Sequence, residues 1–301
     1  MIYQPSQLHS FLSSLNVRAK KSLSQNFLID GNILRKIVKV ADVKPGDLIV
    51  EIGPGPGALT QVLLQAGAHV MAIEKDPVFA ESLARLQTED GRLTVFCEDV
   101  LAFSFEIPQR AKVVANLPYH ITTPVLAKLL PMHAHFSSIT VMVQKEVGQR
   151  MTAERGTSAY SSLTLFLEYY CKAAYSFTVE PTCFFPAPKV QSAVIKLDLR
   201  ETPKEVPAEE FFLLTRTAFG KRRKMLRASL KPVFPAIESA LERAGVPGTL
   251  RPEELSLSDF LRLFLEIQKS EGNAQHQRSH DQNQNKMLSD ERLGLKPIGS
   301  L

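Results

Sequence analysis

The chain has 301 residues, enough for one domain of about 200 residues and a smaller one. Hydrophobic residues make up 44% and charged residues 22%, the balance of a folded protein with a sizeable core. Three cysteines with no Cys-x-x-Cys spacing argue against a disulfide framework or a structural zinc site, and they favour a reducing compartment. We expect all three to be small core residues. The sequence contains no run of 18 apolar residues, so it predicts no membrane span. The formal charge of +5 does not by itself identify a partner.

The first elements along the chain are expected to be helices. Apolar residues recur at helical spacing between Leu8 and Leu15, which predicts a short amphipathic helix ahead of the main domain. A second helix is expected to open at Asp30, and its predicted apolar face is Ile33, Ile37, Val38 and Ala41.

From residue 48 onward, short β-branched runs alternate with helical patterns. The expected strands are Leu48–Ile52, His69–Ile73, Leu93–Cys97, Val113–Asn116 and Ile139–Val143. The expected helices between them include Ala58–Gln65, Val78–Leu86 and Thr123–Leu130. This alternation predicts βαβ units in an α/β fold, with a mainly parallel sheet covered by helices on both faces.

The pattern changes beyond residue 177. Phe177–Leu199 reads as two strands around a proline-rich loop, and Arg200–Pro207 reads as a linker. Three helical patterns then predict a small all-helical domain: Phe211–Phe219, Phe234–Ala244 and Leu257–Ile267. Residues beyond about 270 are rich in Gln, Asn, Ser and His, so we predict a disordered tail over 270–301.

A glycine loop follows the first predicted strand of the sheet. Gly53 and Gly55 let the backbone approach a ligand closely, and the next helix offers free N–H groups at its start. Glu74 follows the second strand at the spacing of an acid that accepts both ribose hydroxyls, and Asp99 after the third can accept from an adenine amino group. The loop therefore predicts an adenosine-containing cofactor. It also fits the dinucleotide pattern G-x-G-x-x-A, so NAD and S-adenosylmethionine both remain open.

The segment Asn116-Leu117-Pro118-Tyr119 ends the fourth predicted strand, at the sheet edge where ligands bind. The lone pair of an exocyclic amine is delocalised into its ring, which makes the nitrogen a poor nucleophile. The Asn116 side-chain oxygen and a backbone carbonyl can each accept one of its N–H groups and direct the lone pair at a methyl donor. A Tyr face offers stacking worth about 1–3 kcal/mol per base. Positioning is then the main catalytic contribution, so we expect no catalytic histidine and no metal.

These motifs together resemble the KsgA/RsmA family of ribosomal RNA adenine N6-dimethyltransferases. The resemblance spans roughly residues 17 to 268 and includes Lys21–Leu28, the Glu51–Thr60 loop, Val143–Val147 and Phe184–Ser192. It implies a Rossmann-like class I methyltransferase with a mainly parallel seven-stranded sheet and an all-helical C-terminal domain. In these terms, we divide the chain into an N-terminal helix and cofactor lid (1–30), a catalytic domain (31–200), an RNA-binding domain (207–269) and the tail. One departure is Ser24, where the family usually has glycine.

The resemblance also implies a role for each matching residue. Gln25, Asn26, Leu28, Gly53 and Gly55 would surround S-adenosylmethionine, Glu74 would hold its ribose, and Asp99 its adenine. Asn116 and the Leu117 carbonyl would hold the target N6, with Pro118 fixing the turn. Tyr119 and Phe184 would stack on the flipped base.

Five basic residues lie within seven positions at the start of the predicted helical domain: Lys221, Arg222, Arg223, Lys224 and Arg227. A cluster of this density attracts phosphates, and we expect it to contact RNA while apolar Met225 and Leu226 pack inward. The expected substrate is 16S ribosomal RNA in the small subunit, methylated by a cytoplasmic monomer. Three alternatives are a 23S ribosomal RNA dimethyltransferase of the antibiotic-resistance type, a NAD(P)-dependent oxidoreductase, and a non-catalytic ribosome assembly factor.

Overall fold

The computed structural model describes residues 4–17, 26–118, 121–221 and 223–270. The chain forms two compact units. Unit 1 contains Met1–Glu154 and Leu163–Thr202, and unit 2 contains Arg155–Ser162 and Pro203–Leu301. Arg155–Ser162 lies within the predicted catalytic domain, and no sequence pattern indicates that it packs with the helical part of the chain.

Unit 1 is built on a seven-stranded sheet with the order β4-β3-β2-β5-β6-β9-β7. Its strands are β2 (Leu48–Ile52), β3 (His69–Glu74), β4 (Leu93–Cys97), β5 (Ala111–Asn116), β6 (Phe136–Gln144), β7 (Cys171–Val179) and β9 (Ser192–Leu199). The pairs among β2 to β6 are parallel, and β9 pairs antiparallel with both β6 and β7. The predicted α/β class with a mainly parallel seven-stranded sheet is therefore confirmed.

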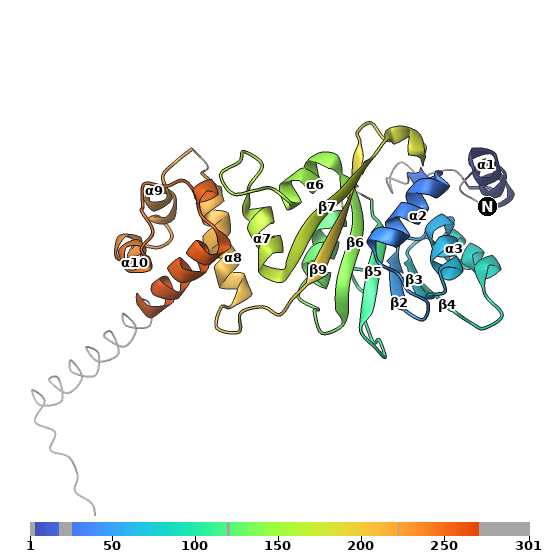
Figure 1. Ribbon diagram of the computed structural model, residues 1–301, viewed down its shortest axis with the longest axis horizontal. Coiled ribbons are helices and arrows are strands. Elements are labelled where there is room, and N and C mark those ends of the chain that lie inside the picture. The colour runs from blue at the N-terminus through green and yellow to red at the C-terminus, as the bar shows by residue number, and fades with distance from the viewer. Residues whose placement is uncertain (1–3, 18–25, 119–120, 222, 271–301) are drawn as a thin grey trace, which may run out of the picture. The chain divides into compact units, whose positions relative to one another are not determined.

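In unit 1 a helix directly precedes the first parallel strand, and further helices come between or after the strands (Figure 1). They are α2 (Gly31–Val40), α3 (Ala58–Gln65), α4 (Pro77–Ser82) with the 3-10 turn Leu83–Leu86, α5 (Thr122–Leu129), α6 (Lys145–Met151) and α7 (Ser162–Tyr170). The predicted start of α2 is confirmed, because the Asp30 side chain accepts from two backbone N–H groups of the first turn. Its buried face differs from the prediction: Leu34 is fully buried, whereas Ile33 and Val38 are only partly buried.

Two N-terminal elements lie outside the large sheet. Helix α1 (Pro5–Ser14) buries Leu8 and Leu12 in a small cluster with Phe27 and Phe79. Strand β1 (Phe27–Leu28) pairs antiparallel with β8 (Phe184–Phe185) in a separate two-stranded sheet. This ladder joins the start of the chain to the proline-rich loop more than 150 residues later.

Unit 2 contains α8 (Ala208–Phe219), α9 (Leu226–Leu230), α10 (Ile237–Ala244), a 3-10 turn (Pro252–Glu254) and a helix described over residues 257–270. The segment 155–162 joins this unit through real contacts: the Gly156 N–H donates to the Glu253 carbonyl at 2.8 Å. The Tyr160 ring also lies 6.1 Å from that of Phe219.

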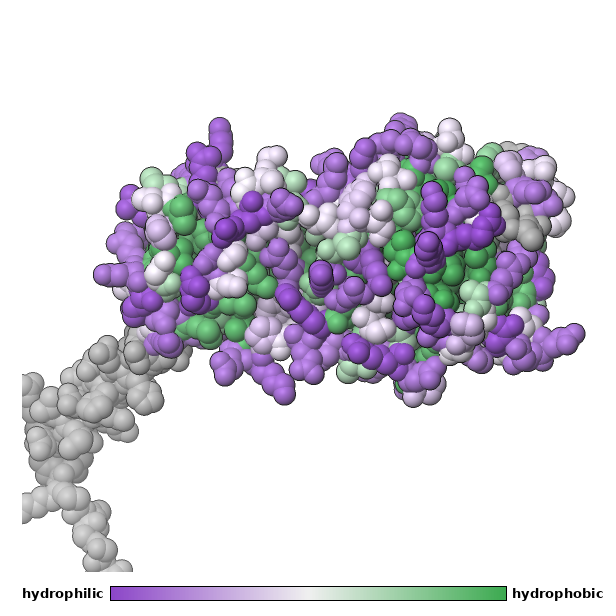
Figure 2. All heavy atoms as spheres, in the orientation of Figure 1, coloured by the Kyte–Doolittle hydropathy of each residue, from purple (hydrophilic) through white to green (hydrophobic). Residues whose placement is uncertain are grey.

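Most of the surface visible in Figure 2 is polar, with apolar side chains showing between polar ones. Among the described residues, no helix is both long enough and apolar enough to cross a membrane. The prediction that all three cysteines are core residues is wrong for Cys97, which is exposed, while Cys171 is buried and Cys183 is intermediate. Cys97 ends β4, an edge strand that pairs with only one neighbour in the sheet, β3.

Candidate active site

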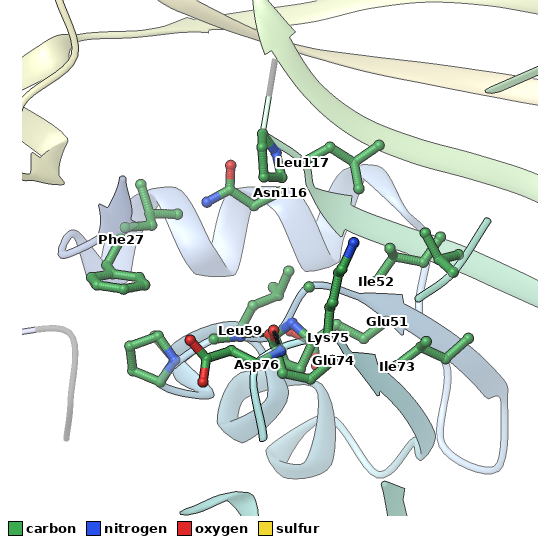
Figure 3. A pocket seen from close by; sticks show the side chains of 18 of the residues that line it. Phe27, Glu51, Ile52, Leu59, Ile73, Glu74, Lys75, Asp76, Asn116 and Leu117 are labelled. Atoms are coloured by element: carbon green, nitrogen blue, oxygen red, sulfur yellow. Dashed lines mark hydrogen bonds between the residues drawn. The ribbon is translucent and has the colours of Figure 1, made fainter. Parts of the chain in front are cut away.

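A pocket of about 280 Å³ opens in unit 1, where β2, β3, β4 and β5 end at their carboxyl edge. It brings together predicted site residues from distant parts of the chain: Asn26, Leu28, Gly53, Gly55, Glu74, Asp99, Asn116, Leu117, Pro118 and Phe184. Two further predicted residues, Gln25 and Tyr119, lie outside the described residues, as does Ser24. Figure 3 shows Asn116 and Leu117 on one side of the pocket, with Glu74 and Asp76 opposite them.

The glycine loop between β2 and α3 needs glycine for different reasons at different positions. Gly53, Gly55 and Gly57 all have positive φ, at 67°, 53° and 83°. A Cβ at Gly57 would stand 2.6 Å from a Leu83 methyl, so this glycine is required for packing. A Cβ at Gly53 would have no atom within 4 Å, so the space beside that backbone is open to a ligand.

Glu74, at the end of β3, is buried against the glycine loop. Its Oε2 accepts the Gly55 N–H at 2.9 Å, and its Oε1 accepts the Asp76 N–H at 2.8 Å. Burial raises its pKa, and these two backbone donors work against that rise. The two bonds fix the carboxyl group at the pocket wall. Each oxygen keeps a second lone pair with which it can accept a hydroxyl.

Asp99 follows β4 and is more exposed than Glu74. Its Oδ2 lies 2.8 Å from the Lys75 ammonium, and its Oδ1 accepts the Leu101 N–H at 2.9 Å. The hydrogen bond from Lys75 is the main cause that lowers the pKa of Asp99. The carboxylate is therefore ionised and is oriented by two donors. Sequence reasoning missed Lys75, which lines the pocket and is labelled in Figure 3.

Glu51 is a second pocket residue that sequence reasoning did not single out. It lies in β2, is 1% exposed, and its Oε2 has no hydrogen-bond partner among the described residues. Burial raises the pKa of Glu51 to about 8, and the nearby Glu74 carboxylate adds to that rise. An acid within the otherwise apolar run Leu48–Ile52 was the available signal.

Asn116 ends β5 at the mouth of the pocket. Its side-chain NH₂ points to the Asn26 carbonyl oxygen at a long 3.5 Å, which turns the amide toward the N-terminal segment. The β1–β8 ladder pairs Leu28 with Phe184, and the Ile29 N–H donates to the Cys183 carbonyl at 2.8 Å. This short sheet explains how the predicted lid residues and the predicted stacking residue reach one pocket.

The predicted RNA-contacting residues lie in unit 2, between the end of α8 and the first turn of α9. Lys221, Arg223, Lys224 and Arg227 are all exposed, and Arg222 lies outside the described residues. Leu226 is fully buried as expected, but Met225 is 42% exposed, so only one of the two apolar residues packs inward.

An open, mainly parallel sheet has a glycine loop after its first parallel strand, acids after the next two strands and the Asn116 segment after the fourth. Together with the solved structures that the chain resembles, this arrangement identifies a class I methyltransferase. Residues 16–269 match the family model described as ribosomal RNA adenine dimethylase, and the chain belongs to that family.

Two relatives and two solved structures illustrate the match. The chain is 55% identical over 280 residues to the ribosomal RNA small subunit methyltransferase A of Protochlamydia amoebophila, covering 90% of this chain and 99% of that protein. It is 49% identical to the protein of the same name from Chlamydia muridarum, covering 86% and 95% of the two chains. A dimethyladenosine transferase from Plasmodium falciparum superposes with a TM-score of 0.73 at 30% identity, covering 81% and 98%. The 23S rRNA methyltransferase ErmE superposes with a TM-score of 0.64 at 27% identity, covering 81% and 100%.

Proposed function

We propose that the chain transfers methyl groups from S-adenosylmethionine to the N6 atoms of two adjacent adenosines in the 3′-terminal hairpin of 16S ribosomal RNA, each twice. The observation that carries this proposal is the placement of Asn116 and Leu117 at the mouth of a pocket that also contains Glu74 and Asp99. An acceptor pair for an amine thus borders a cavity suited to an adenosine cofactor.

The pocket residues fit S-adenosylmethionine. The open space at Gly53 accommodates a ligand chain, the Glu74 carboxylate can accept the ribose hydroxyls, and Asp99 can accept the adenine amino group. Asn26 and Leu28, which line the same pocket, would close the methionine end. When bound, the cofactor supplies an activated methyl group on its sulfonium.

The residues around Asn116 would position the target amine. The Asn116 Oδ1 and the Leu117 carbonyl each accept one N–H of N6, which directs the nitrogen lone pair into the pocket. Buried Phe184 supplies one stacking surface for the flipped base, and Tyr119 would supply the other. The proton of the methylated amine is lost after transfer, so these residues act by positioning.

The small-subunit substrate is supported over the large-subunit alternative by the relatives. The two described above share 49% and 55% identity with this chain and are named small subunit methyltransferases, whereas ErmE shares 27%. A NAD(P)-dependent oxidoreductase would leave the Asn116 segment and Phe184 without a role. A non-catalytic assembly factor would not need Glu74, Asp99 and Asn116 in one pocket, although a role in subunit biogenesis is compatible with activity.

Unit 2 would hold the RNA backbone. The exposed Lys221, Arg223, Lys224 and Arg227 can each approach a phosphate. Binding through such contacts weakens as salt rises. The logarithm of the binding constant falls linearly with the logarithm of the salt concentration, with a slope of about −0.7 to −0.9 per phosphate neutralised. We expect the enzyme to act as a monomer in the cytoplasm, where small subunits are assembled.

The direct test is methyl transfer to defined substrates. Hypomethylated small ribosomal subunits would be incubated with the protein and methyl-labelled S-adenosylmethionine, and the modified nucleosides mapped by mass spectrometry. We expect N6-dimethyladenosine at two adjacent positions near the 3′ end. Asn116→Ala should lower the rate by about 100-fold or more, as expected when a reacting group loses its positioning.

Two controls make the test specific. Asn32→Ala removes an exposed asparagine side chain outside the pocket and should leave the rate unchanged. Large subunits should receive no label. Label confined to large-subunit RNA would move the protein to the resistance-type activity, and no transfer to either subunit would refute the proposal.

A further inference from the structure

Lys128 lies in the last turn of α5 and makes an unusually complete set of contacts. Its ammonium donates to three backbone carbonyls, those of Val100 at 2.9 Å, Leu101 at 2.8 Å and Phe103 at 2.6 Å. An ammonium has three N–H donors, and each of them meets one of these carbonyls. The charge also lies 5.5 Å from the centre of the Phe105 ring.

These carbonyls belong to the tight turn that Asp99 begins. The N–H groups of Ala102 and Phe103 both donate to the Asp99 carbonyl, at 2.9 and 3.0 Å, and the Leu101 N–H donates to the Asp99 side chain. The amides of the turn are therefore directed toward Asp99. Three of its carbonyl oxygens converge on Lys128, whose positive charge stabilises them as a group.

The turn lines the pocket, and α5 follows directly after a segment that also lines it. Val100 and Leu101 line the pocket beside Asp99, whereas α5 begins at Thr122, just after the Asn116–Tyr119 segment. Lys128 thus connects the proposed adenine end of the pocket with the helix that follows the target-binding segment.

We propose that Lys128 is a positioning residue for cofactor recognition: it holds the Val100–Phe103 turn so that the Asp99 carboxylate meets the adenine amino group. This inference rests on the proposed function, because it assigns the adenine to Asp99. It predicts that Lys128 determines preference for the base of the cofactor, although its own ammonium reaches only the protein backbone.

Lys112 provides a matched control. Its ammonium also joins two segments, donating to Asp47 Oδ2 at 2.7 Å and to the Asp42 carbonyl at 2.5 Å, and its side chain is only 20% exposed. It lies near the start of β5, whereas the pocket opens at the carboxyl ends of the strands. Lys128→Met and Lys112→Met each remove an ammonium group that donates hydrogen bonds to loop residues, but only Lys128 donates to the turn that follows Asp99.

The experiment compares two ligands that differ in the base. Binding of S-adenosylhomocysteine and of S-inosylhomocysteine, in which an oxygen replaces the amino group, would be measured by calorimetry for each variant. We expect Lys128→Met to weaken S-adenosylhomocysteine binding about tenfold, the scale of one charge-assisted hydrogen bond, with little change for the inosine analogue. Lys112→Met should leave the ratio of the two affinities unchanged even where it lowers the melting temperature.

Two further readouts separate positioning from general stability. The KM for S-adenosylmethionine should rise in Lys128→Met while kcat changes little, and the variant should have no further effect on base preference when Asp99 is already replaced by asparagine. If Lys128→Met lost affinity equally for both ligands, or lost none, the positioning role of Lys128 would be overturned, while the proposed function would stand. Failure of the unaltered chain to bind S-adenosylhomocysteine would overturn the proposed function with it.

Discussion

Glu51 provides a quantitative test of how the pocket is built. Replacing it with glutamine keeps the size and shape of the side chain but removes its ability to ionise. Because burial raises the pKa of Glu51 to about 8, the native protein keeps this carboxyl protonated near neutral pH, where the unfolded chain has already lost the proton. The neutral amide should therefore be tolerated where an ionised carboxylate would not be.

The size of the effect follows from the displacement of the pKa. The pKa moves from 4.5 to about 8, and each pKa unit corresponds to about 1.4 kcal/mol, so the full effect is about 5 kcal/mol. Water that enters the pocket would reduce this value, which makes it an upper limit. Thr60 offsets only part of the rise in the pKa of Glu51.

The sign of the pH dependence of the unfolding free energy follows from which state, native or unfolded, holds the Glu51 proton. Between about pH 4.5 and pH 8 the native state binds the Glu51 proton and the unfolded state does not, so the free energy of unfolding falls as pH rises. The stabilising contribution is complete below the unfolded pKa and is lost as pH rises through the folded one. Glu51→Gln should lack this dependence.

The measurement is urea denaturation of both proteins, without ligand, from about pH 5 to about pH 9. We expect the free energy of unfolding of Glu51→Gln, relative to the parent chain, to increase by about 3–5 kcal/mol across that range. Glu89→Gln, at an exposed site, should give a difference that does not vary with pH. A difference for Glu51→Gln that is equally independent of pH would show that the native carboxyl is ionised, and the reasoning would be wrong.

Three other substitutions test separate features of unit 1. Gly57→Ala should cost about 1–3 kcal/mol of unfolding free energy, because its Cβ would overlap the side chain of Leu83. The control Gly91→Ala has a similar positive φ of 68° but open space around its Cβ, so it should cost less. Equal losses in the two variants would refute the packing argument. Asp30→Ala should cost about 1 kcal/mol by thermal or urea unfolding through loss of the α2 N-cap, and Asp30→Ser should restore most of it; no recovery would contradict a capping role. Asp99→Asn should reduce the preference for S-adenosylhomocysteine over its inosine analogue, because an amide can donate to the inosine oxygen; an unchanged ratio in calorimetry would remove Asp99 from the adenine subsite.

The parallel strands were predictable because their residues follow a local rule. Leu48–Ile52 and Leu93–Cys97 have the predicted bounds, as does the helix Ala58–Gln65. Strands inside a parallel sheet read as short β-branched or apolar runs, and the glycine loop marks the strand-to-helix turn. The same local order places Gly53, Glu74, Asp99 and Asn116 at successive carboxyl ends of strands, which is why the pocket could be anticipated.

Other features depend on contacts that leave no local pattern. The β1–β8 ladder has two residues in each strand, too few for any periodicity, and the packing of Arg155–Ser162 with unit 2 is visible only from its partners. The short helix α9 was missed for the same reason: its five residues, Leu226–Leu230, do not complete two helical turns. Lys128 gave no signal either, because its three acceptors are backbone carbonyls, which no sequence pattern identifies.

Three of the acids that line the pocket are held by different means. Asp99 is ionised beside Lys75, and Glu74 is buried but accepts two backbone N–H groups. Glu51 is buried, and one of its oxygens has no hydrogen-bond partner in the described part of the chain. If Glu51 and Glu74 were both ionised, their repulsion would have to be met in a region of low dielectric constant, where it is strongest. Protonation of Glu51 removes that repulsion, and the Glu74 carboxyl group keeps its two backbone hydrogen bonds. Glu51→Lys would replace a neutral carboxyl group with a positive charge beside Glu74. We expect this variant to lose binding of S-adenosylhomocysteine in calorimetry even if the sheet still folds.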